Sequence, residues 1–600
     1  MFITKNLINA FKKCNFKNAK HSSLDQIEYG NGTIENDPKN ISEAVNNHFV
    51  TLVDQLFKNK VNVIDPDSRT DNKLENIIKK SLFLKPINTK FVSDFIKGMD
   101  HKKSNRSDSP QTKFLKIAVD IIAPILTYIF NSCIEEGVFP ETLKIAEVIP
   151  IFKSGNRSII NNYRPISLLS PFAKILENYI YNELLDFLNK HRILYNLQYG
   201  FRQDSSTELA VSQIVEDLAE SMDNNKINCS VFLDLAKAFN TVNHEILLTK
   251  LNKCGVRGIT LKLFESFLGN RKQFTTINNH SSSLESIDTG VPQGSTLGPL
   301  LFLIYINDLP TATTMKVRLF ADDACLSMEH NDPSTLQLLV NRELSKVHCW
   351  LDTNKLFINY SKSNFLIFTN KKHNHTFDLK IGLETIHQKC STKYLGIILD
   401  DKLTWEPHIE NLKTKLARTC YIFYKLKNYV NENTLKMVYY SLVYPHLQYG
   451  ITSWGKAAGY LIKKIITMQK SIVKIICRKG KREPSTPLFF RLGMLKLEDV
   501  YKLQLSKLVH KYKNESLIGE GRLVRLRDVH SYNTRLAANS NYFIPRRNKD
   551  VGRNCFSCSG PTIWQNVPSN LKALSFESFK LRLKNHLLEM YNPDQPSVSA

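Results

Sequence analysis

Apolar and polar residues alternate with two different periods along this chain, and the change of period predicts its helices and strands. Residues 172–190 place seven apolar side chains on one face of a helix: Phe172, Ile175, Leu176, Tyr179, Ile180, Leu184 and Leu188. Ser205-Ser-Thr-Glu208 has the pattern of a capping box, which predicts a helix from there to about Met222. Helical patterns also cover residues 243–254, 259–268 and 298–309, and the chain after Asp401 is mainly helical.

Two segments follow the period of β-strands and end in carboxylates. Residues 228–235 form a short apolar strand that contains Asp234 near its end. Residues 316–328 alternate around an acidic centre, which predicts a β-hairpin with Asp322 and Asp323 at its turn. Between the two lies the Gly- and Pro-containing turn Gly290–Gly294. If the strands pair, the three aspartates come together, and the mixture of elements predicts an α+β fold.

The first 110 residues differ in texture from the rest. They are rich in Asn, Lys, Ser and Asp, with one amphipathic stretch near residues 41–57. We interpret them as a loosely structured lead-in, with denser patterning from about Phe114. A chain of 600 residues also exceeds what one hydrophobic core usually organises, so we expect three or more modules.

Composition narrows the class of protein. The net charge is +25, and residues 401–600 hold 34 Lys and Arg against 14 Asp and Glu. An excess of 20 positive charges in the last third attracts a polyanion, of which nucleic acid is the obvious one. The longest apolar runs are too short to cross a bilayer, and the N-terminus does not resemble a signal peptide. Eleven scattered cysteines suit a reducing compartment. We therefore expect an intracellular protein of the nucleus and cytoplasm, neither secreted nor bound to membrane.

Three converging carboxylates repel one another unless divalent cations neutralise them. Hard oxygen ligands favour Mg²⁺ or Mn²⁺, and two such ions about 4 Å apart are the arrangement that polymerases use. An isolated Asp-Asp pair more often only satisfies a turn, because Asp tolerates turn geometry well. The metal interpretation therefore depends on other motifs.

Those motifs occur in order. They are Val148–Lys153, Asn162–Leu169, Tyr199–Arg202, Phe232–Phe239, Gly290–Phe302, Phe320–Asp323 and Lys393–Ile397. As a set they resemble the blocks of reverse transcriptases from non-LTR (LINE-type) retrotransposons, of the jockey and CR1 kind. The resemblance implies an RNA-directed DNA polymerase that extends a DNA 3′-hydroxyl with dNTPs on an RNA template, using two Mg²⁺ or Mn²⁺ ions.

The resemblance also implies an architecture, a right-hand polymerase. Fingers and an antiparallel-sheet palm would occupy residues 115–401, a helical thumb 402–480 and a basic, mainly helical region 481–600. Residues 1–110 resemble the linker that joins endonuclease and polymerase in LINE proteins, and they hold no endonuclease motif. A nick in the target DNA would then come from a separate endonuclease.

Roles carry over residue by residue. Asp234 and Asp322 would be the main metal ligands, Asp323 would support them, and the backbone carbonyl of Leu235 could complete a metal shell. The positions that match nucleotide-binding residues of the family are Lys153 and Arg164 for the triphosphate, Phe239 for exclusion of a 2′-hydroxyl, Gln293 and Gly294 for template and nucleotide, and Lys362 for protonation of the pyrophosphate.

The chain departs from the family at Asn240, where the usual pattern Ala-Phe-Asp-Thr-Val has Asp. This change keeps open an inactive relic that binds nucleic acid without polymerising. An RNA-dependent RNA polymerase is a second alternative, against which Phe239 argues. Cys555-Phe-Ser-Cys558 has ligand spacing but no further cysteine follows, so we expect no zinc site. Arg478–Arg482 is either a nuclear-import signal, a template contact or a solvated helix end.

Overall fold

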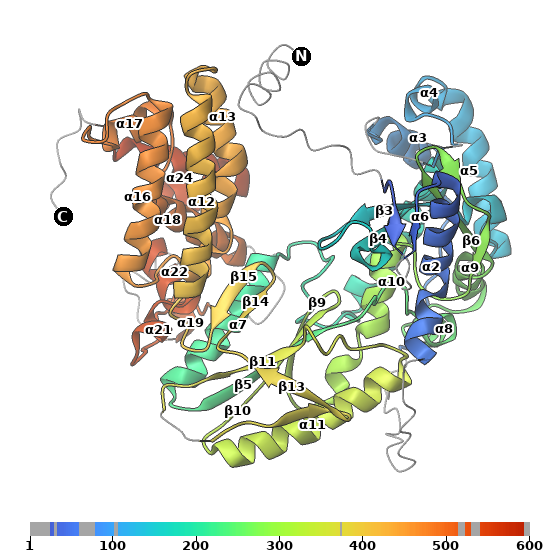
Figure 1. Ribbon diagram of the computed structural model, residues 1–600, viewed down its shortest axis with the longest axis horizontal. Coiled ribbons are helices and arrows are strands. Elements are labelled where there is room, and N and C mark those ends of the chain that lie inside the picture. Colours follow the sequence, from blue (N-terminus) through green and yellow to red (C-terminus); the bar gives the residue numbers. More distant parts are fainter. Residues whose placement is uncertain are drawn as a thin grey trace.

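The computed structural model of the chain describes residues 24–28, 33–58, 78–100, 106–107, 109–371, 375–513, 523–529 and 541–592. Helices and sheets are mixed within these residues, which confirms the expected α+β class. Figure 1 shows a central sheet flanked by an N-terminal group of elements on one side and the C-terminal helices on the other. No helix among the described residues combines the length and apolarity needed to span a bilayer.

Six strands form the central sheet in the order β12-β13-β11-β5-β10-β9. Their bounds are β5 (Ile227–Asp234), β9 (Lys316–Phe320), β10 (Asp323–His330), β11 (Asn364–Phe368), β12 (Leu379–Ile381) and β13 (Glu384–Gln388). Strand β5 pairs antiparallel with β10 and β11, and every one of its residues before Asp234 is buried. Successive side chains of a strand point to opposite faces. Accordingly Val231 and Leu233 pack into one hydrophobic core, whereas Phe232 packs into another.

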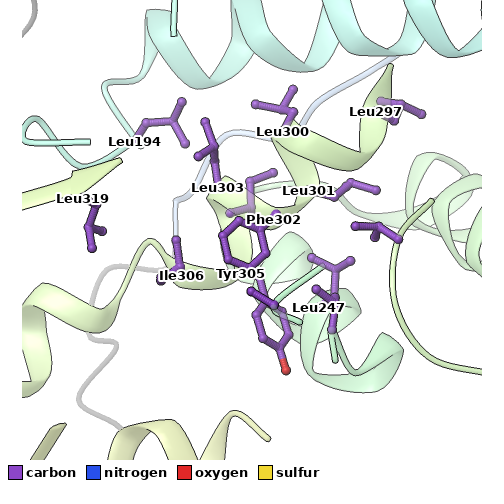
Figure 2. Close-up of a cluster of buried hydrophobic side chains, with 14 of the residues drawn as sticks. Leu194, Leu247, Leu297, Leu300, Leu301, Phe302, Leu303, Tyr305, Ile306 and Leu319 are labelled. Atoms are coloured by element: carbon purple, nitrogen blue, oxygen red, sulfur yellow. The ribbon is translucent and has the colours of Figure 1, made fainter. Parts of the chain in front are cut away.

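Helices cover the sheet and join it to the N-terminal group. They are α6 (Pro171–Lys190), α7 (Thr207–Asp223), α8 (His244–Lys253), α9 (Gly258–Leu268), α10 (Leu297–Ile306) and α11 (Pro333–Thr353). Helix α10 is apolar around its whole circumference and lies in the first core, where Figure 2 shows Leu300, Leu303 and Phe302 among side chains of neighbouring elements. Its N-terminus is capped from α6, since the buried Glu177 carboxylate accepts the N–H of Thr296 at 2.7 Å. A carboxylate at this end of a helix is also favoured by the helix dipole.

A second sheet organises the N-terminal group, in the order β4-β3-β6-β7 with β8 beside β6. Its bounds are β3 (Ile145–Phe152), β4 (Tyr163–Leu168), β6 (Arg271–Ile277), β7 (His280–Ser281) and β8 (Glu285–Ile287). The remaining elements of this group are β1 (Ile27–Glu28), β2 (Ile34–Glu35), α2 (Pro38–Lys58), α3 (Thr89–Gly98), α4 (Thr112–Ile117) and α5 (Val119–Glu136).

The expectation of a loosely structured lead-in over residues 1–110 is wrong for two described segments. Helix α2 buries Ile41, Val45 and Phe49 in a core shared with β3 and β6. The buried Asn46 amide donates to the Ser283 carbonyl at 3.1 Å. Helix α3 packs against α5. In these two helices, polar residues occupy the exposed faces or, like Asn46, form hydrogen bonds in the interior.

The C-terminal part is helical, as predicted, after the hairpin of β14 (Ser391–Tyr394) and β15 (Ile397–Asp400). Its helices are α12 (Glu406–Leu426), α13 (Glu432–Leu442), α14 (Tyr444–Gln448), α15 (Ile451–Trp454), α16 (Gly459–Ile476), α17 (Thr486–Leu492), α18 (Leu497–Lys513), α19 (Leu526–Val529), α21 (Asp550–Arg553), α22 (Phe556–Gln565), α23 (Ser569–Lys572) and α24 (Phe576–Glu589). They are tied to α7, where the Asp223 carboxylate accepts the N–H groups of Asn548 at 3.0 Å and Lys549 at 2.7 Å.

These elements bear on three local expectations from the sequence. The predicted capping box begins at Ser205, but the N-cap of α7 is the next residue, Ser206, whose hydroxyl accepts the Leu209 N–H at 3.1 Å. Glu208 instead accepts the N–H of Gly450 at 2.8 Å. Cys555 and Cys558 are buried thiols. The Arg478–Arg482 run follows α16, is exposed, and is anchored where Arg478 donates to the Lys427 carbonyl at 3.1 Å.

Candidate active site

Strand pairing brings the three aspartates to one end of the central sheet. In the register of β5 and β10, Asp234 lies directly opposite Asp323. Asp322 precedes Asp323 in the turn that joins β9 to β10. Residues opposite each other in an antiparallel pair lie about 5 Å apart at Cα. Strand ends that are 89 positions apart in the sequence, Asp234 and Asp323, therefore present their carboxylates to the same small space.

A loop from a distant segment fixes the turn that holds Asp322. The Gln198 side-chain oxygen accepts the N–H of Ala321 at 3.1 Å and that of Gly200 at 2.8 Å. Ala321 has a φ of 55°, a left-handed conformation that costs energy for a residue with a Cβ. A Cβ on Gly200 would overlap the Ala321 backbone, so glycine permits this approach. Gln198 directly precedes the Tyr199–Arg202 motif, and no sequence motif points to it.

The carboxylates are poorly neutralised within the protein. Burial, followed by repulsion from Asp322 and Asp234, raises the pKa of Asp323 to about 6. Burial, with Asp234 adding to it, also raises the pKa of Asp322. Among the described residues, no three His, Cys, Asp or Glu side chains already stand in a metal-binding arrangement. The donor set nevertheless fits a hard divalent cation, because crowded carboxylate oxygens whose charge is disfavoured gain most from one.

Four cations lie around these carboxylates. The Lys362 ammonium is 3.6 Å from the Asp234 carboxylate. Burial and the nearby charges of Arg164 and Lys362 lower the pKa of Lys153. Burial and the charges of Lys153, Arg164 and Lys362 lower the pKa of Lys237. Cations this close together are arranged to receive a polyanion, which would relieve the repulsion that helps to lower the pKa of Lys153 and Lys237.

Local backbone structure explains where these cations stand. Lys153 follows β3, and its N–H donates to the Asn162 carbonyl at 2.8 Å. Arg164 lies opposite Ile151 in the pairing of β3 with β4. Lys237 has a φ of 52° in the turn after β5. Lys237 lies inside the Phe232–Phe239 motif, but the motif alone assigns it no role.

The segment that contains Lys362 forms hydrogen bonds with the backbone of Asp234. The Asp234 carbonyl accepts the N–H of Asn359 at 2.8 Å, and its N–H donates to the Ser363 hydroxyl at 3.2 Å. Leu235 forms a bridge with Ile358. This ladder fixes the end of β5 and places Lys362 beside the first aspartate, although its sequence motif is loose.

Phe239, in the turn after β5, belongs to a cluster of aromatic rings. Its ring lies parallel to that of Phe302 with centroids 4.8 Å apart, and the ring of Phe201 meets it edge-on at 6.1 Å. The N–H of Val291 donates to the Phe239 carbonyl at 2.8 Å, which joins this turn to the Gly290–Gly294 turn. The aromatic ring therefore has a fixed orientation.

The Gly290–Gly294 turn touches β4 closely. The Ser167 N–H donates to the Gln293 carbonyl at 2.8 Å. Gly294 has a φ of 141°, and a Cβ there would overlap the Ser167 carbonyl oxygen, so the position requires glycine. The Gln293 amide donates to the Asn240 side-chain oxygen at 2.9 Å. Asn240, the departure from the family pattern, thus keeps an acceptor for Gln293.

Helix α2 reaches this region as well. The His48 pKa is lowered by burial and by the charge of Lys237. Phe49, Asn240 and Gln293 line a cavity between α2, β4 and the Gly290–Gly294 turn, and the buried Arg271 lines it from β6. A segment that resembles a linker in sequence therefore lines a cavity next to the Gly290–Gly294 turn.

The chain is similar to one protein family and to several individual proteins. Residues 151–399 match the family described as reverse transcriptase (RNA-dependent DNA polymerase), a range that holds every candidate residue from Lys153 to Lys362. The chain is 29% identical over 416 residues to the RNA-directed DNA polymerase from mobile element jockey of Drosophila melanogaster, covering 67% of this chain and 45% of the relative. It is 30% identical over 420 residues to the probable RNA-directed DNA polymerase from transposon BS of the same species, covering 68% and 46%. The corresponding protein of its X-element is 27% identical over 420 residues, with the same coverage. The chain spans less than half the length of these relatives.

Proposed function

Residues 151–399 form a reverse transcriptase domain similar to those of non-LTR mobile elements, and from this premise we propose that the chain is an active RNA-directed DNA polymerase. It would extend a DNA 3′-hydroxyl with dNTPs on an RNA template. The observation that carries the proposal is the pairing of Asp234 with Asp323 across β5 and β10, with Asp322 in the adjoining turn.

The metal-binding groups in this proposal are the carboxylates of Asp234, Asp322 and Asp323 and the backbone carbonyl of Leu235. Two Mg²⁺ or Mn²⁺ ions, when bound, supply activation of the primer 3′-hydroxyl and stabilisation of the departing pyrophosphate. The repulsion from Asp322 and Asp234 that helps to raise the pKa of Asp323 supports their presence, since a bound divalent cation would neutralise the crowded carboxylates. Asp234 would exchange its contact with Lys362 for a metal contact.

The nucleotide would lie between the carboxylates and the cations. Lys153 and Arg164 would bind the triphosphate, and Lys237 extends the same cationic wall. Lys362 would donate a proton to the leaving pyrophosphate, a role supported by its position 3.6 Å from Asp234. Binding at charged groups positions the α-phosphorus for in-line attack.

Three further residues would shape the nucleotide pocket. Phe239, held by Phe302, would lie under the sugar and exclude a 2′-hydroxyl. Gln293 and Gly294 would contact nucleotide and template through the turn that approaches β4. The alternative of an inactive relic rests on Asn240, yet the hydrogen bond from Gln293 to Asn240 supports retention of the local geometry.

In this proposal the molecule is a right hand. The sheet of β3, β4 and β6 with its helices would be the fingers, the central sheet the palm, and α12–α16 the thumb. The basic C-terminal region would bind RNA or DNA through phosphate contacts. Partners would be the RNA template, the DNA primer and a separate source of target-site nicks, inside the cell.

A primer-extension assay with purified protein, an RNA template, a DNA primer, dNTPs and Mg²⁺ tests the proposal. Asp322→Ala should abolish incorporation, whereas Asp550→Ala, which changes an aspartate with an 89% exposed side chain, should leave it intact. No incorporation by the wild-type protein above the Asp322→Ala level would favour the relic. Incorporation of ribonucleotides as readily as deoxynucleotides would favour an RNA polymerase and remove the role of Phe239.

A further inference from the structure

A row of isoleucines is exposed along the helices α4 and α5, which follow each other with only Ala118 between them. Ile117, Ile121, Ile125 and Ile129 are spaced four residues apart, with exposed fractions of 73%, 72%, 56% and 42%. Phe114 and Tyr128 flank the row and are 62% and 76% exposed. Exposed apolar residues are normal singly, but a contiguous row of this kind marks an interaction site.

The opposite face of α5 packs against the rest of the N-terminal group. Ala123, Leu126 and Phe130 are buried in the first core, where α5 packs against α3 and α9. A helix that is apolar on both faces belongs in the interior of an assembly, because water disfavours its outer face. The row therefore lacks a covering surface within the described chain.

The geometry of the row suits a copy of itself. Side chains four residues apart form a ridge, and ridges of this type interdigitate when two helices cross. At 1.5 Å per residue the part of the ridge within α5, from Ile121 to Ile129, is about 12 Å long, and Ile117 extends it from the end of α4. A two-fold axis beside α5 would bring this ridge against the same ridge of a second copy, with the two helices antiparallel.

Charges at the two ends of the ridge agree with that arrangement. Lys113 is exposed, four residues before Ile117, and Glu136 is exposed at the last residue of α5. Neither forms an ion pair within the described residues. A cation near the start of a helix and an anion at its end oppose the helix dipole, so these positions do not stabilise their own helix. In an antiparallel pair Lys113 of each copy would approach Glu136 of the other. The acidic end of the row also disfavours an anionic membrane or nucleic acid as the occupant.

We propose that two copies of this chain associate through the α4–α5 ridge about a two-fold axis. Figure 1 places α5 at the outer edge of the N-terminal group, on the far side of the molecule from the C-terminal helices. Association there leaves the aspartates of both copies open to primer and template. The inference does not depend on catalysis, because the ridge contains none of the candidate site residues.

Sedimentation velocity over a concentration series of the full chain tests whether two copies associate through the ridge. The protein is treated with nuclease and measured in high salt, so that nucleic acid cannot bridge two basic molecules. The wild-type protein should show a dimer that dissociates on dilution. Ile121→Asp changes both sides of a two-fold interface and should weaken the dimer at least a hundredfold. The matched control is Leu338→Asp on α11, where a leucine 71% exposed lies outside the ridge and the dimer should persist.

A charge exchange tests the antiparallel pairing. Lys113→Glu should weaken the dimer a few-fold, as expected for exposed ion pairs, and the double change Lys113→Glu with Glu136→Lys should restore it. A wild-type protein that stays monomeric at its highest soluble concentration would overturn the proposal. So would a dimer unaffected by Ile121→Asp, or a monomer whose binding to neutral lipid vesicles is lost in Ile121→Asp, which would assign the ridge to a membrane.

Discussion

Replacing Gly294 by alanine tests whether the turn that carries Gln293 must approach β4 as closely as it does. Gly294 has a φ of 141°, a backbone conformation that residues with a Cβ rarely adopt. A Cβ at this position would overlap the Ser167 carbonyl oxygen, whereas real Cβ atoms essentially never come closer than 3.0 Å to such an atom. The atom in the way belongs to the backbone, so no side-chain rotation relieves the overlap.

The expected loss of stability has two contributions, the unfavourable backbone conformation and the overlap with Ser167. The backbone conformation alone costs an alanine about 1–3 kcal/mol. Relieving the overlap requires the turn to move from β4 by about 1 Å, which also weakens the bond from the Ser167 N–H to the Gln293 carbonyl, about 1 kcal/mol. A total of about 2–4 kcal/mol should lower Tm by several degrees. A 1 Å displacement beside a reacting group costs about a hundredfold in rate, so kcat/KM for dNTP should fall by about that factor.

Single-nucleotide incorporation and thermal unfolding measure both effects in the same preparation. Gly459→Ala is the matched control, since no atom lies within 4 Å of a Cβ at the start of α16 and its φ is ordinary. That variant should match wild type in rate and Tm. If Gly294→Ala also matched wild type, the close approach of the turn to β4 would be wrong, together with the role drawn from it.

Three other outcomes are expected. Lys237→Ala should raise KM for dNTP about tenfold or more with a smaller change in kcat, because a charged contact to phosphate is worth about 1.5–3 kcal/mol; an unchanged KM would place Lys237 outside the nucleotide site. Asn240→Asp keeps the acceptor for the Gln293 amide, so steady-state incorporation should equal or exceed wild type, and a large loss would show that Gln293 needs the neutral amide. Burial lowers the pKa of His408 to about 4, and the same side chain in the unfolded chain titrates near 6.5. The unfolded state therefore takes up the proton first as pH falls. The contribution of His408 to the free energy of unfolding is complete above about pH 6.5 and declines as pH falls toward about 4. Denaturant unfolding of His408→Asn should show a shallower decline between these pH values, and an equal slope would contradict the burial of a neutral imidazole.

Local periodicity was sufficient to predict the elements that carry the aspartates. Residues 228–235 and 316–328 follow the two-residue period of strands, and the turn between β9 and β10 is short. The meeting of Asp234 with Asp323 then follows from antiparallel pairing. Arg164 and Gly294 were identified because each lies inside a motif that resembles a block of the reverse transcriptase family.

Contacts between distant segments could not be predicted in the same way. Glu208 has a capping-box position in the sequence, but its partner is the Gly450 N–H, 242 residues away. Gln198 binds the Ala321 turn across 123 residues. The row of Ile41, Val45 and Phe49 was visible as an amphipathic stretch, yet the surrounding polar composition hid that its partner is the sheet of β3 and β6.

Strand β5 has a consequence for how far the matched stretch can be exchanged between related proteins. One of its faces packs into the core around α10, and the other lies under α7 and Tyr394 of β14. Helix α7 packs in turn against α15, α21 and α22, so the folding unit is longer than the 151–399 stretch that matches the family. Recombination that joined this stretch to the C-terminal helices of a diverged relative would replace the surface against which α7 packs, and the hybrid would have to repack that surface to keep β5 in place.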